Sequence, residues 1–209
     1  MEKQQLRERR IRTDLDTGVD FEEVYRRNGK RHRDGKEGPA FILRDRVTGA
    51  AEIEEYYWYD RLHRENGPAV ILRRAASGTN EVVVEEEYRR HGRYHRNSAD
   101  GPAVIRRNAT TGIVLEESYF ENDELHRDPA EGPATITRNA STGRVVGETY
   151  WVRGQRRRDL ADGPAIIVRD PVTGAVTQER YFVDGREVSP PQRPERTRQP
   201  GGPGSDLSR

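Results

Sequence analysis

The sequence predicts an all-β fold: an elongated antiparallel array of β-hairpins, built either as a single twisted sheet or as a flattened β-solenoid. Three features recur along the 209 residues. Gly-Pro-Ala begins at Gly38, Gly67, Gly101, Gly132 and Gly163. A Thr-Gly or Ser-Gly pair ends at Gly18, Gly49, Gly78, Gly112, Gly143 and Gly174, and a tyrosine follows at Tyr25, Tyr57, Tyr88, Tyr119, Tyr150 and Tyr181. From Tyr57 onward the tyrosines are 31 residues apart, and a fixed period in this range is typical of a stacked repeat array.

The composition favours a thin body with a narrow core over a compact globule. Apolar residues make up 32% of the chain and charged residues 35%, whereas a compact domain of this length is usually close to half apolar. The formal net charge is +1, which argues against a protein that binds polyanions through bulk electrostatic attraction, so nucleic acid is not a favoured partner. The absence of cysteine excludes disulfides, thiolate metal sites and cysteine nucleophiles.

The chain has no apolar run that approaches the roughly 20 residues of a membrane span, so no transmembrane segment is expected. Its first 12 residues are highly charged and lack the apolar core of a signal peptide. We therefore expect a cytoplasmic protein, with export by a route that needs no such signal left open.

The pattern divides the chain into three parts. Residues 1–10 form a charged lead that is expected to be frayed or weakly helical. Residues 11–188 form the repeat domain, with a half unit at 11–25 that lacks Gly-Pro-Ala, followed by five units. In residues 189–209 Pro and Gly are dense and apolar residues nearly vanish, which predicts a disordered tail.

Each unit is expected to hold two good strands and one short strand in an antiparallel meander. The segment after Gly-Pro-Ala is rich in Val and Ile and ends in a turn such as residues 169–174, where Pro presets φ and Gly supplies a positive φ. The second strand ends in a turn such as Asn28-Gly29, and a short third segment ends in His-Arg. Two units deviate, by an insertion at a hairpin tip between Gly78 and Tyr88 and by a shortened third segment between Tyr57 and Gly67.

Invariant residues mark one face of each strand, because side chains two residues apart point to the same side. On the second strand, a glutamate precedes the tyrosine by two residues at Glu23, Glu55, Glu86, Glu117, Glu148 and Glu179. The residue two further back is Phe21, Ile53, Val84, Leu115, Val146 or Thr177. The face of the first strand has Ala, Ile and Arg, with the isoleucines at Ile42, Ile71, Ile105, Ile136 and Ile167. A hairpin loop of three or five residues would place both faces on one side, which we expect to be the inner one.

Two sets of arginines can neutralise these glutamates. One set lies two residues after each isoleucine, at Arg44, Arg73, Arg107, Arg138 and Arg169. The other set ends the third segments, at Arg33, Arg64, Arg96, Arg127 and Arg158. A buried carboxylate is costly unless it is paired, and Arg is its usual bidentate partner. We therefore predict an internal Glu–Arg ladder, lined by the tyrosines, that fixes strand register more than it adds stability. The alternative is that six stacked carboxylates bind cations.

Histidines precede the arginines of four third segments, at His32, His63, His95 and His126. One candidate ligand per unit is a weak metal signal, and Arg157 replaces the histidine in the last unit, so no metal or cofactor is predicted. The remaining interpretations are a His-Arg row that binds phosphates and plain packing of each histidine on the next Gly-Pro.

Two tryptophans, Trp58 and Trp151, follow invariant tyrosines and should fall on the opposite face of the strand. We predict that they are exposed, and they are candidate partner-contact residues together with the four histidines. Aromatic residues at strand period also fit a base-stacking platform, although they are more often core or cross-strand pairs.

The sequence shows no catalytic constellation: it has no nucleophile elbow, phosphate loop or pair of acids in distinct environments. An enzyme also needs one site with unique residues, whereas nearly every notable polar residue recurs here. We therefore predict a protein without catalytic activity.

The stretch from Tyr25 through Asn28-Gly29 to His32-Arg33, with its weaker echoes, resembles the Tyr-x-x-Asn-Gly core of MORN repeats and of bacterial MORN-like repeats of the antitoxin type. The resemblance covers roughly residues 11–188. It implies an elongated array of β-hairpins that serves, without catalysis, as a scaffold for proteins or lipid head groups.

These observations predict a non-enzymatic scaffold whose partner is a protein or another copy of the chain, because an extended surface with one contact per unit lets weak contacts sum. One alternative is a self-assembling subunit of a head-to-tail filament. A second is binding of acidic lipid head groups or nucleic acid through the His-Arg row.

Overall fold

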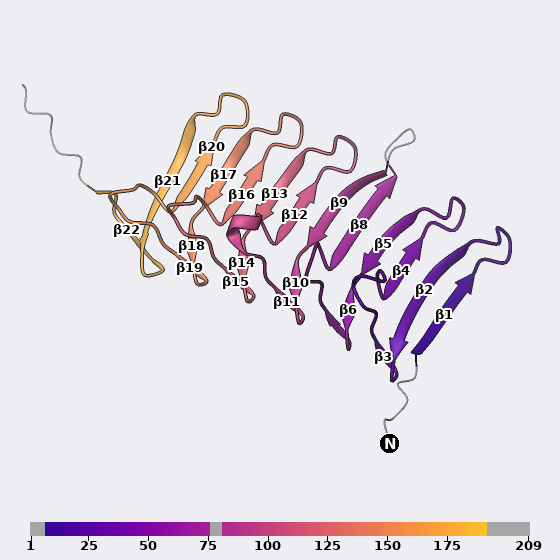
Figure 1. Cartoon of the computed structure of the whole chain (residues 1–209). Coiled ribbons are helices and arrows are strands. Elements are labelled where there is room, and N and C mark those ends of the chain that lie inside the picture. Colours follow the sequence, from indigo (N-terminus) through magenta and orange to yellow (C-terminus); the bar gives the residue numbers. More distant parts are fainter. Residues whose placement is uncertain (1–6, 76–80, 192–209) are drawn as a thin grey trace, which may run out of the picture.

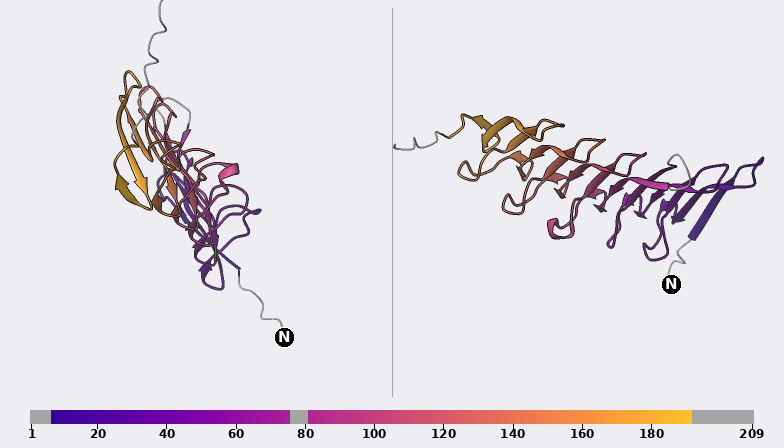
Figure 2. Two further views of the ribbon diagram at one scale, coloured as in Figure 1. Left: turned by 90° about the vertical axis from the view of Figure 1, so that its left-hand side faces the viewer. Right: turned by 90° about the horizontal axis from the view of Figure 1, so that it is seen from above.

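The computed structural model of the chain is an open, elongated all-β sheet, and it describes residues 7–75 and 81–191. In this part of the chain thirteen antiparallel strands follow one another in one path whose two ends do not meet (Figure 1). The strands of the path are β1 (Arg7–Thr13), β2 (Asp20–Arg27), β4 (Phe41–Arg44), β5 (Ala51–Glu55), β8 (Val70–Ala75), β9 (Glu81–Glu87), β12 (Val104–Arg107), β13 (Val114–Ser118), β16 (Thr135–Arg138), β17 (Val145–Thr149), β20 (Ile166–Arg169), β21 (Val176–Val183) and β22 (Arg186–Val188). Figure 2 shows a body that is long in one direction and narrow when seen end-on.

A second tier of narrow hairpins runs along one side of this sheet, at the bottom of Figure 1. Its strands are β3 (Lys30–Arg31), β6 (Tyr57–Trp58), β7 (Arg61–Leu62), β10 (Arg89–Arg90), β11 (Arg93–Tyr94), β14 (Phe120–Glu121), β15 (Glu124–Leu125), β18 (Trp151–Val152) and β19 (Gln155–Arg156), and one connection holds a short 3-10 helix, η1 (Ser98–Asp100). Backbone hydrogen bonds join neighbouring narrow hairpins, for example from Asp60 N–H to the Arg31 carbonyl at 2.9 Å. The units are therefore in contact in both tiers.

The predicted all-β, antiparallel hairpin architecture is confirmed, with two differences in its elements. Residues 7–10, predicted as a frayed or weakly helical lead, belong to β1. In the interior units the second strand stops at the invariant tyrosine, where the chain leaves the main sheet and enters a narrow hairpin. Residues 1–6, Gly78 with the tip of its predicted insertion, and residues 192–209 of the predicted tail lie outside the described residues.

Turn chemistry accounts for both kinds of hairpin. In the wide hairpins an Asp or Asn folds the loop: the Asp45 carboxylate accepts two backbone N–H groups at 3.0 and 2.7 Å, and Gly49 closes the loop at φ +75°. In the narrow hairpins both turn residues have positive φ, as at Asn28 (52°) and Gly29 (75°). This is the type I′ geometry that matches the twist of paired strands.

One row of side chains crosses the whole sheet and alternates isoleucine with glutamate. Glu148, for example, lies opposite Ile136 of its own hairpin and Ile167 of the next. The row consists of Ile11, Glu23, Ile42, Glu54, Ile71, Glu86, Ile105, Glu117, Ile136, Glu148, Ile167 and Glu179. Residues directly opposite each other share a face, so the invariant residues of both strands lie on one side.

That side is not an inner one, contrary to the prediction. Buried residues occur on both faces: Ile42 is 7% exposed on the Ile/Glu face, and Val104 is 3% exposed on the other. The main sheet is a single layer in the described part of the chain, so neighbouring side chains shield one another without a second layer above them. The most complete burial is at the junction of the two tiers, where all five alanines of Gly-Pro-Ala are 0% exposed.

Candidate binding surface

The junction between the tiers repeats one stack of side chains. The arginine that ends each third segment lies over the ring of the tyrosine that begins the same narrow hairpin, within cation–π distance. The distances from guanidinium carbon to ring centroid are 3.9 Å for Arg33 on Tyr25, 3.8 Å for Arg64 on Tyr56, 3.7 Å for Arg96 on Tyr88, 4.0 Å for Arg127 on Tyr119 and 4.1 Å for Arg158 on Tyr150. Each guanidinium also donates to the proline carbonyl of the next Gly-Pro-Ala, as from Arg127 to Pro133 at 3.3 Å.

The stack explains why Gly-Pro-Ala recurs. Gly132 has φ +127°, and a Cβ atom there would lie 3.1 Å from Nη1 of Arg127. The carbonyl of the fully buried Ala134 accepts a hydrogen bond from Tyr119 N–H at 2.8 Å. A side chain at the glycine, or a larger one at the alanine, would displace the arginine or the tyrosine.

The structure thus gives the two arginine sets different roles. The sequence predicts that the arginines of the third segments join the glutamate ladder; instead, all five lie on the tyrosine rings. The reason is that the chain leaves the main sheet at the tyrosine, so the third segment no longer runs beside the glutamates. The ring and the carbonyl together fix the orientation of each guanidinium through contacts made within the array.

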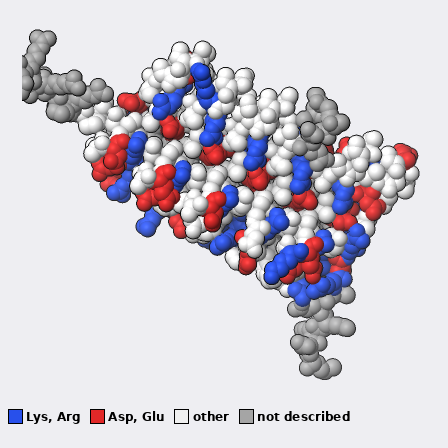
Figure 3. Space-filling model, turned by 45° about the horizontal axis from the view of Figure 1, so that its top comes forward, with Lys and Arg blue, Asp and Glu red and all other residues white. Residues whose placement is uncertain are grey.

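The arginines of the first strands reach the glutamates. Each lies diagonally across from the glutamate of the preceding unit, at 3.8 Å for Arg44 and Glu23, 2.8 Å for Arg73 and Glu54, 2.6 Å for Arg107 and Glu86, 2.5 Å for Arg138 and Glu117, and 2.9 Å for Arg169 and Glu148. Glu23 is also paired with Arg9 of β1. On the face drawn in Figure 3, acidic and basic side chains recur together along the length of the array.

One unit is displaced by a residue from the predicted pattern. Glu54 and Tyr56 take the places that the spacing assigns to Glu55 and Tyr57. Glu55 lies on the opposite face of the strand, where it accepts a hydrogen bond from the Tyr57 hydroxyl at 2.9 Å. The cause is the Tyr56-Tyr57 doublet, in which the second tyrosine happens to keep the 31-residue spacing to Tyr88. Ile53, predicted beside the ladder, consequently faces the other way.

The histidines of the third segments pack against neighbouring residues in the second tier. The His32 ring is buried against Trp58 and Tyr59, at 4.4 and 4.3 Å between ring centroids, and this burial lowers its pKa. Nδ1 of His126 accepts the Arg153 N–H at 3.4 Å, which links neighbouring units. His95 is also partly buried.

His63 forms a pair that the sequence pattern does not reveal. Its ring stacks on His91 at 4.4 Å, and its Nδ1 accepts the backbone N–H of His91 at 3.3 Å. Burial and the neighbouring His91 lower the pKa of His63. His91 lies in a turn with no equivalent histidine in other units, so periodicity could not single it out.

The two tryptophans are not equivalent. Trp58 is 42% exposed, as predicted, and its ring lies beside His32 and His63. Trp151 is only partly exposed and lies 5.0 Å from the guanidinium of Arg156. The one-residue displacement explains the difference, because the position of Trp151 corresponds to Tyr57 and not to Trp58.

A second set of contacts that the sequence did not indicate lies on the opposite face of the sheet. Arg106 donates to Glu85 at 2.9 Å and to Glu116 at 3.0 Å, and Ser118 donates to Glu116 at 2.9 Å. These alternate positions differ between units, so no repeat marks them.

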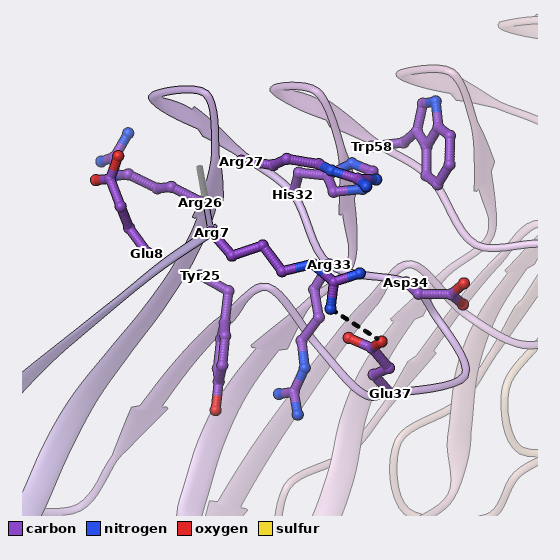
Figure 4. Close-up of a pocket in the computed structure, with 10 residues that line it drawn as sticks. All are labelled: Arg7, Glu8, Tyr25, Arg26, Arg27, His32, Arg33, Asp34, Glu37 and Trp58. Atoms are coloured by element: carbon purple, nitrogen blue, oxygen red, sulfur yellow. Dashed lines mark hydrogen bonds and ion pairs between the residues drawn. The ribbon is translucent and has the colours of Figure 1, made fainter. Parts of the chain in front are cut away.

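Shallow grooves follow one another along the second tier. The first, of about 110 Å³, has His32 beside Arg27, Trp58 at its rim and Arg7 reaching Glu37 at 3.6 Å (Figure 4). The second, of about 410 Å³, lies between the connections at 33–36 and 63–66 and includes Trp58 and His91. The next two, of about 360 and 260 Å³, share the connection at 95–97. Successive grooves therefore share walls, which makes them one continuous, mixed-charge surface.

In residues 7–75 and 81–191 no group of three or more His, Asp or Glu side chains is placed to hold a metal ion. The same residues contain no helix long and apolar enough to cross a membrane. Comparison of the chain with models of protein families, with curated proteins and with solved structures found no match.

Proposed function

We propose that the chain is a non-enzymatic scaffold that binds an extended stretch of a partner protein along its row of grooves. The observation that carries the proposal is that successive grooves share their walls, with the 42% exposed ring of Trp58 between the first two. Shallow open grooves suit a segment that lies across several units better than a small molecule, which is usually enclosed.

The repeat character supports such a role. We infer a single twisted sheet that repeats at the 31-residue spacing of its tyrosines from Tyr88 to Tyr181. Each unit then adds a similar contact, and weak contacts made by one partner sum. The resemblance to MORN repeats, which implies a scaffold, points to the same kind of function.

The proposal is tested by affinity purification from an extract of the source cells, followed by binding of the recovered partner to purified variants. Trp58→Ala should weaken the partner's binding at least about tenfold, since a central aromatic anchor typically contributes about 2 kcal/mol or more. Val172→Ala is the matched control, because Val172 is 74% exposed at the tip of a wide hairpin away from the grooves. Equal binding by all three proteins would refute the groove as the contact surface.

The alternatives predict different behaviour in the same preparations. Binding of acidic lipid or nucleic acid through the His-Arg row would fall steeply with added salt. A head-to-tail filament would appear as long assemblies in mass photometry or negative-stain microscopy, whereas the scaffold gives discrete particles.

A further inference from the structure

Every interior glutamate of the Ile/Glu row sits in the same four-sided site. Glu148 illustrates it: an isoleucine lies on either side, Ile136 and Ile167, and Arg169 reaches its carboxylate at 2.9 Å. The backbone closes the site, because the carbonyl of Ala165 accepts the Tyr150 N–H at 2.8 Å. The alanine, isoleucine and arginine on the far side of Glu148 all belong to the first strand of the next unit, where they occur in the order Ala-x-Ile-x-Arg.

The last unit presents this site with one wall missing. Glu179 lies opposite Ile167, but no described strand pairs with it on its other side, because β22 pairs with β21 only from Tyr181 to Val183. Its carboxylate is exposed, and the contact it makes in the structure is a 3.5 Å hydrogen bond from the Tyr181 hydroxyl. Val176, on the same strand, is 45% exposed. Ser189 occupies the position, eight residues after the tyrosine, that an arginine holds in the interior units, so Tyr181, which is partly buried, has no such arginine over its ring.

The other end of the sheet is built differently. In β1, Arg9 stands where the interior first strands have alanine, and it pairs with Glu23, which is 6% exposed and also contacts Arg44. A charge placed on the inward face of an edge strand is a known protection against pairing with another chain. The two ends are therefore unlike: the first edge has its glutamate satisfied, and the last edge does not.

We propose that the outer edge of β21, from Val176 to Arg180, is a strand-addition site for an extended segment of a partner protein with the pattern Ile-x-Arg. Main-chain hydrogen bonds would bind the segment, and the alternate side chains would select it. The isoleucine would lie beside Glu179, and the arginine would pair with its carboxylate. This edge lies apart from the grooves, so the inference does not rest on the proposed function.

A second copy of the chain fits this edge poorly. In the described part of the chain, the only first strand with one unpaired edge is β1, which would offer Ile11 and Thr13 where the pattern requires Ile and Arg. Glu179 would then meet a threonine in place of an arginine.

The chain supplies its own probe: an end-capped peptide with the sequence of residues 101–107, Gly-Pro-Ala-Val-Ile-Arg-Arg, which carries the pattern. Titrated into the ¹⁵N-labelled full chain, it should shift the resonances of residues 176–183 in a saturable way. Glu179→Gln should weaken the binding about tenfold, because a charge-assisted pair is lost. A peptide with Arg107→Ala should be weakened to a similar degree. Glu124→Gln, at an exposed carboxylate of a narrow hairpin, is the matched control and should bind like the unmodified chain.

Three results would overturn the proposal: no saturable shifts, shifts that are insensitive to Glu179, or shifts that centre on other strands. Sedimentation of the chain alone separates the occupants. A monomer across the concentration range supports a partner protein, whereas self-association abolished by Glu179→Gln would assign the edge to a second copy and overturn the choice of a partner. Trp58→Ala tests the grooves independently, since it leaves the peptide site intact.

Discussion

Replacing Arg127 with alanine should destabilise the array substantially, because this side chain makes two contacts at the junction of the tiers. Its guanidinium lies 4.0 Å from the ring centroid of Tyr119 and donates to the Pro133 carbonyl at 3.3 Å. A partly desolvated cation–π contact contributes about 1–2 kcal/mol, and a charged hydrogen bond of this length about 1–1.5 kcal/mol. The free energy of unfolding should therefore fall by about 2–3.5 kcal/mol, a decrease in Tm of roughly 5–10 °C for a chain of this size.

Two further variants control this experiment, which is read by circular dichroism during thermal and urea unfolding. Arg153→Ala, at an exposed turn of a narrow hairpin, should change stability by no more than about 0.5 kcal/mol. Arg127→Lys keeps the charge but loses the planar fork, so it should recover only part of the deficit. The reasoning is refuted if Arg127→Ala is as stable as Arg153→Ala.

Three other substitutions test separate parts of the fold. Gly132→Ala should cost about 1–3 kcal/mol, because φ is +127° and the new Cβ would approach Arg127; unchanged thermal stability would contradict the stack. Glu117→Gln breaks the ion pair with Arg138, in which each side chain is 22% exposed, and should lower the free energy of unfolding by only about 0.5–1 kcal/mol. This loss should shrink in 1 M salt, and a loss that does not depend on salt would argue against an ion pair. The pKa of His63 is lowered in the folded chain, so on acidification the unfolded chain binds a proton at this histidine before the folded chain does. The contribution of neutral His63 to the free energy of unfolding is therefore complete above about pH 6.5 and is lost as the pH falls below that value. His63→Asn should flatten this part of the profile of stability against pH, and an unaltered profile would assign it to other groups.

The sequence was sufficient for the fold class because the local signals agree with one another. Recurring Asp-to-Gly loops, Asn28-Gly29 and the alternation of Ile with small or polar residues all predict hairpins, and the structure has them. The faces were also predictable, since Glu148 and Ile167 lie on one side of the sheet as the period of two requires.

The roles of the arginines could not be predicted in the same way. Arg138 and Arg127 recur at the same spacing, so periodicity cannot tell which of them reaches a glutamate. That depends on where the chain bends out of the main sheet, and the bend at Tyr119 becomes visible only in three dimensions. The displaced register at Tyr56 has a similar origin, because either tyrosine of the doublet satisfies the sequence pattern.

The candidate binding surface was harder still to predict. Trp58 was identified correctly as exposed, but the grooves beside it are lined by unique residues such as His91 and Lys36. A repeat pattern draws attention to what is common to all units, whereas a specific contact depends on what distinguishes one unit from the others.

Amide hydrogen exchange resolved by residue tests the central claim most directly: in the described part of the chain, each unit docks on the next through a tyrosine N–H. The amides of Tyr25, Tyr56, Tyr88, Tyr119 and Tyr150 each donate to an alanine carbonyl at 2.7–2.8 Å and should all exchange slowly. Fast exchange at any of these five amides would contradict the account.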